Sequence, residues 1–280
     1  MAGRRIEREE AMSGTRFPWL GNAILVAALL IALTTRADEP VAVPAPYEAW
    51  PQADIAARAF GLLAGQRQAW LSDARLWPAQ DGNLLAVIAE AERPNVDGAF
   101  CDCARPARLA LIEEIAGELH TVAAALIPDL RPGMTLALNS ALIDATLARG
   151  GTFRLSGSET LLPLVRTWDE NGRRRAELTL YRQGERRLAP VFSRLILDDP
   201  TVTDPDLSGM QARIRMGDLD PGGLAGFADI RFVERYFTRF DEDIIDLDDR
   251  RIEVWVFGGD RFSLVQCELS GPMGYGACVQ

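Results

Sequence analysis

The chain has 280 residues, with 30 basic and 40 acidic side chains and a formal net charge of −10. This length allows one large domain or two small ones. An apolar fraction of 48% is too high for a disordered chain. The acidic balance argues against nucleic acid as the main partner, because phosphate binding draws on a surplus of Lys and Arg.

Two residue types that often act in catalysis are absent or nearly absent. The sequence has no lysine, which excludes Schiff-base chemistry, the phosphate-loop lysine and protein kinases. The single histidine, His120, cannot by itself build a metal site of two or three histidines. Any Ser-His-Asp or Cys-His arrangement would have to use it. Its place at the edge of an apolar stripe favours a half-exposed helix histidine.

The N-terminal region carries the densest apolar run, ILVAALLIAL over residues 24–33. In one interpretation, residues 1–16 are a charged n-region and residues 17–37 a signal peptide cleaved before Asp38. In the other, residues 17–35 form an uncleaved anchor of about 28 Å, with the N-terminus held in the cytoplasm by its arginines. A buried core helix is the remaining alternative. Both main interpretations place the rest of the chain in the periplasm or at the extracytoplasmic face of the inner membrane.

Residues 38–51 contain four prolines and are predicted to be an extended, Pro-rich spacer. Folding is expected to begin near Gln52.

The four cysteines are Cys101, Cys103, Cys267 and Cys278. In an exported chain an even number of cysteines predicts disulfides, with three possible connectivities. The glycine-rich segment between Cys267 and Cys278 favours a local bridge at the C-terminus. Redox activity is less consistent with the C-x-C spacing of the other pair, and the spacing does not match a zinc knuckle.

Residues 52–151 are predicted to be mostly helical. Helices are expected over residues 53–73, 84–92, 109–127 and 135–149. The third of these carries apolar residues at 3-4-3-4 spacing, which is typical of an amphipathic helix: Ile112, Ile115, Leu119, Val122 and Leu126.

In residues 152–280, apolar and polar residues alternate with a period of two, which is typical of strands. Asn171-Gly172 predicts a hairpin between strands at 164–169 and 175–181, and Gln183-Gly184 a turn into a third strand. Residues 200–223 are expected to be a long loop, residues 224–240 a covering helix, and Gly258-Gly259 the turn of a last hairpin. The predicted class is therefore α+β, with a helical N-terminal part followed by an antiparallel sheet with one covering helix. Residues 52–280 are compatible with a single domain.

Two charged clusters are candidate binding sites. Arg173, Arg174 and Arg175 lie at a predicted hairpin tip, where they are suited to an anionic partner such as a lipid headgroup, a glycan or an acidic protein. The acidic run at residues 241–249 offers Asp241, Asp243, Asp246 and Asp248 as oxygen ligands for calcium. That run lacks the spacing of an EF-hand, and solvated faces are the favoured interpretation of both clusters.

No catalytic residue is assigned from the sequence. The leading hypothesis is an exported, non-enzymatic protein, tethered or periplasmic, that binds a partner or assists assembly of an envelope or surface structure. The partner is expected to be an envelope protein or an anionic surface component, with no cofactor other than calcium. The alternative is an exported hydrolase that uses two carboxylates, such as Glu159 and Asp169, on cell-wall or polysaccharide substrates.

Overall fold

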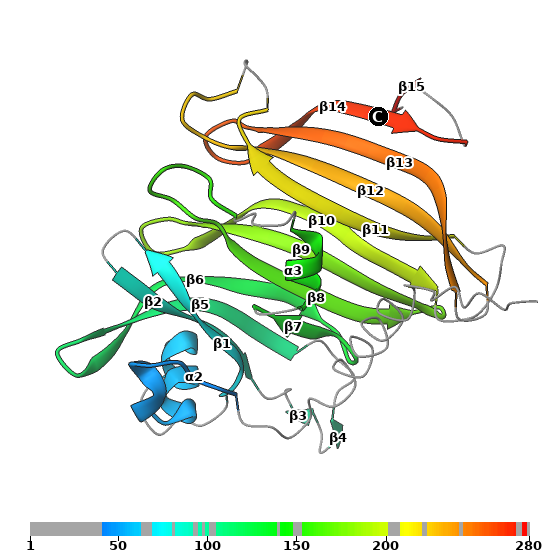
Figure 1. Cartoon of the computed structure of the whole chain (residues 1–280). Helices are drawn as coiled ribbons and strands as arrows, with labels where there is room; N and C mark the ends of the chain where they lie inside the picture. The colour runs from blue at the N-terminus through cyan, green and yellow to red at the C-terminus, as the bar shows by residue number, and fades with distance from the viewer. Residues whose placement is uncertain are drawn as a thin grey trace, which may run out of the picture. The chain divides into compact units, whose positions relative to one another are not determined.

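Figure 1 shows a computed structural model of the chain. The residues that the structure describes are 41–62, 69–79, 82–91, 95–96, 99–100, 105–138, 141–147, 153–200, 208–219, 223–240, 243–272 and 276–278. The predicted charged segment 1–16 and signal or anchor segment 17–37 lie outside them. Within these ranges, no helix combines the length and apolar character needed to cross a membrane.

Two antiparallel sheets and a few short helices make up the fold. The first sheet has the order β1-β2-β5-β6, and the second has nine strands in the order β15 to β7, each beside its neighbour in sequence. A two-stranded ribbon, β3–β4, completes the pairing. The helices are η1 (Tyr47–Ala49), α2 (Gln52–Phe60) and α3 (Ala141–Thr146). The strands are β1 (Ala69–Ala79), β2 (Gly82–Ala91), β3 (Asn95–Val96), β4 (Ala99–Phe100), β5 (Arg105–Ile115), β6 (Glu118–Leu130), β7 (Thr135–Ala137), β8 (Leu162–Glu170), β9 (Arg173–Gln183), β10 (Leu188–Pro200), β11 (Ser208–Gly217), β12 (Asp229–Phe240), β13 (Asp243–Phe257), β14 (Phe262–Ser270) and β15 (Gly276–Ala277).

The predicted fold class is wrong, because the N-terminal part is a sheet rather than a set of helices. Of the predicted helices, the first survives only as α2, and the fourth is replaced by β7 and α3. Residues 84–92 belong to β2, and residues 109–127 form the β5–β6 hairpin. The expected covering helix at 224–240 is instead β12, in the middle of the second sheet.

The cause of this error is that the first sheet is covered on both faces. One face packs on α2 and the residues before it, through Ile55, Ala56 and Ala59. The other face packs on β7–β9 of the second sheet, through Leu162, Leu164 and Tyr181. A strand buried on both sides has no alternation of polar and apolar residues, and all six residues from 84 to 89 are indeed buried.

The predicted hairpins of the C-terminal part are confirmed. Asn171 and Gly172 have positive φ angles of 52° and 70° and join β8 to β9, as expected of a two-residue hairpin turn. The turns into β10 and into β14 also lie where the sequence predicts them. The predicted loop at 200–223, however, contains β11.

Part of the predicted spacer is packed on the folded unit. Tyr47 is buried in the cluster below α2, and Val41 and Val43 pack against that cluster. The Gln52 side chain donates a hydrogen bond to the Val41 carbonyl oxygen at 2.6 Å. The folded unit therefore extends back to at least Val41.

Candidate functional site

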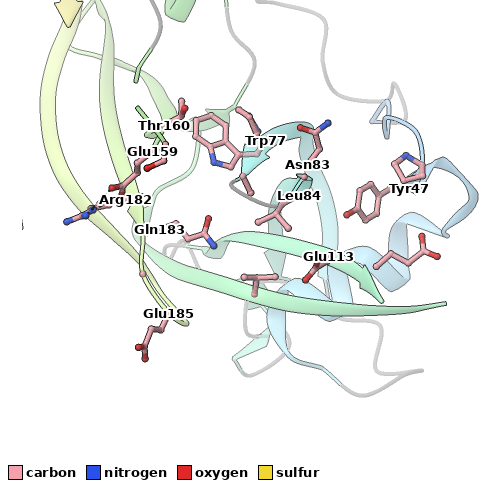
Figure 2. Close-up of a pocket in the computed structure, with 18 residues that line it drawn as sticks. Tyr47, Trp77, Asn83, Leu84, Glu113, Glu159, Thr160, Arg182, Gln183 and Glu185 are labelled. Carbon is pink, nitrogen blue, oxygen red and sulfur yellow. Dashed lines mark hydrogen bonds and ion pairs between the residues drawn. The ribbon is translucent and has the colours of Figure 1, made fainter. Parts of the chain in front are cut away.

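An open cleft of about 890 Å³ lies where the two sheets meet. The first sheet contributes the β1–β2 hairpin, the end of β5 and Val122 of β6. The second sheet contributes the segment before β8 and the β9–β10 hairpin. Figure 2 shows Asn83 and Glu113 on one side of the cleft and Arg182 and Glu159 on the other. Concave sites of this size are where ligands usually bind, so the cleft is the first candidate site.

Acidic side chains dominate the lining of this cleft. Four carboxylates, those of Glu113, Glu114, Glu159 and Glu185, face a single cation, Arg182. The wall between them is apolar and includes Trp77, Leu84 and Val122. An apolar wall with carboxylates at its edge suits a ligand that carries both aliphatic surface and positive charge.

The one cation of the cleft is fixed by its own chain. Arg182 Nε and Nη2 donate to the two carboxylate oxygens of Glu159 at 2.6 and 3.0 Å. Arg182 Nη1 donates to the Gly259 carbonyl oxygen at 2.6 Å, and the guanidinium lies 5.2 Å from the centre of the Phe257 ring. The hydrogen bond to Glu159 raises the pKa of Arg182 above its ordinary value. Both carboxylate oxygens of Glu159 are thereby engaged by Arg182.

The two carboxylates named for hydrolysis do not form a pair. Glu159 precedes β8, whereas Asp169 lies near the end of that strand. The seven steps from Leu162 to Asp169 span roughly 23 Å of extended chain, and glycoside hydrolysis needs two carboxyl groups about 5–10 Å apart. Asp169 lies instead 3.5 Å from Arg174.

His120 lies on β6, directly opposite Glu113 of β5. Its side chain is 46% exposed, and Nε2 is 3.8 Å from a carboxylate oxygen of Glu118. The expected half-exposed position is therefore found, but on a strand rather than a helix. It stands near the edge of the cleft without lining it.

The three arginines predicted to hold an anion are each paired with carboxylates of the same chain. Arg173 Nε donates to Asp198 at 2.6 Å, and Arg174 lies beside Asp169. Arg175 pairs with Glu170 at 2.5 Å and with Asp198 at 3.4 Å. These ion pairs satisfy the charge of the hairpin internally.

The predicted calcium ligands are only partly described. Asp241 lies outside the described residues, and of Asp243 only the backbone is described. Asp246 accepts a hydrogen bond from the Asp248 backbone N–H at 2.9 Å. Among the described residues, no group of three or more His, Cys, Asp or Glu side chains is arranged to hold a metal.

The local disulfide at the C-terminus is present. Cys267 and Cys278 are bonded, with a Cα–Cα distance of 5.4 Å, and the Cys278 N–H donates to the Cys267 carbonyl oxygen. The bridge holds the last residues of the described chain to β14. Cys101 and Cys103 lie outside the described residues.

A buried ionic cluster, which the sequence analysis did not find, lies on one face of the second sheet. Arg194 and Arg251 both donate to Glu253, which is fully buried. Trp255 Nε1 donates to the other Glu253 oxygen at 2.9 Å, and Tyr236 donates to the buried carboxylate of Glu234 at 2.6 Å. Each carboxylate is satisfied, so the cluster acts as a structural link between β10, β12 and β13.

A group of unpaired arginines was also missed. Arg213, Arg215, Arg231, Arg235 and Arg250, here called the arginine face, come from β11, β12 and β13. The alternating run Gln-Ala-Arg-Ile-Arg at 211–215 carried the signal, since residues 211, 213 and 215 are exposed between buried neighbours. Interpreting residues 200–223 as a loop and 224–240 as a helix hid this pattern.

Comparisons with protein-family models, with curated proteins and with solved structures found no match to this chain.

Proposed function

We propose that this chain is a non-enzymatic, exported envelope protein whose folded unit binds an extended, positively charged segment of another envelope protein in the cleft. Support for export comes from the apolar run at 24–33 and from the Cys267–Cys278 disulfide, which is typical of oxidising compartments. Residues 17–35 would tether it to the membrane, or cleavage before Asp38 would release it to the periplasm.

The observation that carries the proposal is the charge of the cleft. Its lining holds four carboxylates against one arginine, and that arginine is already neutralised by Glu159. The remaining carboxylates, Glu113, Glu114 and Glu185, belong to the same lining as Trp77, Leu84 and Val122, and apolar surroundings strengthen the attraction of a carboxylate for a cation relative to open water. A segment that alternates basic and aliphatic side chains fits both features.

The test is binding of a synthetic peptide of alternating lysine and valine, measured by fluorescence anisotropy at low salt with the purified protein. Removing two cleft charges in the double variant Glu113→Gln/Glu185→Gln should weaken binding roughly tenfold, as expected for two partly screened charges. The matched control, Glu48→Gln/Asp218→Asn, removes two exposed acids outside the cleft and should leave the affinity within twofold. Absence of binding, or an equal loss in both double variants, would contradict the proposal.

A further inference from the structure

The arginine face lies on three neighbouring strands with all five side chains on the same side. Arg215 is directly opposite Arg231, and Arg235 is directly opposite Arg250. Arg213 is opposite Val233, which is itself opposite Ile252. Since directly opposed residues of antiparallel strands share a face, the five guanidinium groups form one basic surface.

Within the described part of the chain, the arginine face holds far more positive than negative charge. Like charges directly opposite each other on a sheet destabilise it, and here two such pairs occur. None of the five arginines has an ion-pair partner among the described residues. The Nε atoms of Arg235 and Arg250 are buried without a hydrogen-bond partner. The carboxylate on the same side of β14, Glu268, accepts a hydrogen bond from Gln266.

Aliphatic side chains fill the space between the arginines. Val233, Ile252 and Val254 lie on the same side of the sheet and are half-buried. The cluster that joins the two sheets takes its second-sheet residues from β7 to β10 and the β7–α3 segment. The first sheet therefore does not cover the arginine face, which presents an apolar centre with arginines on its β11 and β12 sides and Glu268 of β14 opposite Ile252.

The β5–β6 hairpin carries the complementary surface at its tip. Ile115 is 51% exposed and directly opposite Glu118, and Glu113 lies on the same side of the hairpin, two residues before Ile115. Ala116 and Gly117 make the turn, with positive φ angles of 53° and 81°. An exposed apolar side chain between two carboxylates matches an apolar centre between arginines in both chemistry and sign.

We propose that the arginine face binds the β5–β6 hairpin tip of a second copy of this chain. In Figure 1 the hairpin tip and strands β11–β13 lie on opposite sides of the folded unit, so one chain cannot satisfy its own face. Contacts between two different surfaces join copies head to tail and produce a ring or a filament. The proposal rests on the proposed function only in that both make this chain a binding protein of the envelope.

The first test is sedimentation of the purified protein at rising concentration and low salt. Self-association should appear in the micromolar range and weaken at least tenfold between 20 and 300 mM salt, because it depends on exposed charge pairs. Arg215→Glu/Arg231→Glu should be monomeric under all these conditions, and so should Ile115→Arg/Glu118→Arg, which keeps the carboxylates that line the cleft. A wild-type protein that stays monomeric, or that binds anionic phospholipid vesicles through these arginines without self-associating, would overturn the inference.

The second test mixes the two charge-reversed variants. In the first variant the pair at positions 215 and 231 is acidic like the hairpin tip, and in the second variant the tip is basic like the arginine face. An equimolar mixture offers a basic tip to the acidic pair and an acidic tip to the intact arginine face. Assembly should therefore return in the mixture and alternate between variants. Continued monomers in the mixture, with circular dichroism showing both variants folded, would overturn the inference. Lysine–valine peptide binding by Arg215→Glu/Arg231→Glu reports separately on the cleft, so failure of self-association leaves the proposed function standing.

Discussion

At the scale of single residues, this molecule uses arginine in two distinct ways. Arg194 and Arg251 are partly buried and converge on one carboxylate, that of Glu253. Arg213 and Arg215 project from the same sheet without an acidic partner among the described residues. The first arrangement requires its acid for the sheet to be stable, whereas the second leaves charge available for a partner.

Removing the acid of the buried cluster should destabilise the fold strongly. Glu253→Ala leaves two partly buried guanidinium groups and the Trp255 N–H without their acceptor. We expect a loss of about 3 kcal/mol in the free energy of unfolding, measured by urea denaturation. Glu268→Ala is the control, because this exposed carboxylate bonds only to Gln266 among the described residues, and it should cost less than about 0.5 kcal/mol. Equal effects of the two substitutions would show that the cluster is not a structural link.

The tyrosines predict a loss of stability at alkaline pH. Burial raises the pKa of Tyr47, Tyr181 and Tyr236 above the ordinary value of 10.0, and the hydrogen bond to Glu234 raises that of Tyr236 further. A raised pKa means that the neutral phenol is favoured in the fold, so its stabilisation is complete below pH 10 and declines as the pH rises above it.

The melting temperature should therefore be nearly constant from pH 8 to 9.5 and fall above pH 10. In a Tyr275→Phe background, which keeps only these three tyrosines, tyrosinate absorbance at 295 nm should rise together with the loss of the circular dichroism signal. In Tyr236→Phe, which removes one ionisable group, the decline should be shallower. Three tyrosines that ionise near pH 10 with the fold intact would show that burial does not hold these phenols neutral.

At the scale of elements, the hairpin turns could be predicted from the sequence. Helix-like spacing of apolar residues, in contrast, did not identify helices. Asn171-Gly172 specifies its hairpin because both residues take positive φ angles readily. The 3-4-3-4 pattern over residues 109–127 arose across a turn, where Ile112 and Leu119 meet the same cluster from two different strands. A local pattern cannot reveal that both faces of a sheet are covered, because that depends on α2 and on strands far along the chain.

The substitution Gly117→Ala distinguishes the hairpin from the predicted helix, because the change in the free energy of unfolding has opposite signs in the two structures. Within a helix, Gly117→Ala would stabilise the protein by about 1 kcal/mol. In the β5–β6 turn its φ is 81°, and nothing lies within 4 Å of an added Cβ atom, so the backbone alone decides the outcome. We expect a destabilisation of about 1 kcal/mol by urea unfolding.

Gly157→Ala provides the matched control for that substitution. Its added Cβ also meets nothing within 4 Å, and its φ is not positive. This variant should be neutral or slightly stabilising. Stabilisation by Gly117→Ala would contradict the turn at this position and, with it, the exposed hairpin tip.

At the scale of the whole molecule, charge summed along the sequence does not show which arginines are paired within the chain. Residues 154–194 carry a surplus of arginine, yet Arg173, Arg174 and Arg175 are paired with acids of the same chain. Alternation along β11 and β12 places Arg213, Arg215 and Arg231 on one face and Glu234 on the other, within a stretch whose summed charge is acidic. The cleft could not be predicted from the sequence either, because its two sides come from different sheets.

The export prediction has a direct test in the mass and location of the protein. In an oxidising compartment Cys267 and Cys278 should be bonded, so alkylation without reduction should leave both thiols unmodified in a peptide map. Loss of residues 1–37 in a soluble periplasmic fraction would establish a cleaved signal peptide, and a full-length mass in the membrane fraction would establish a tether. A full-length protein in the cytosol with both cysteines alkylated would contradict export.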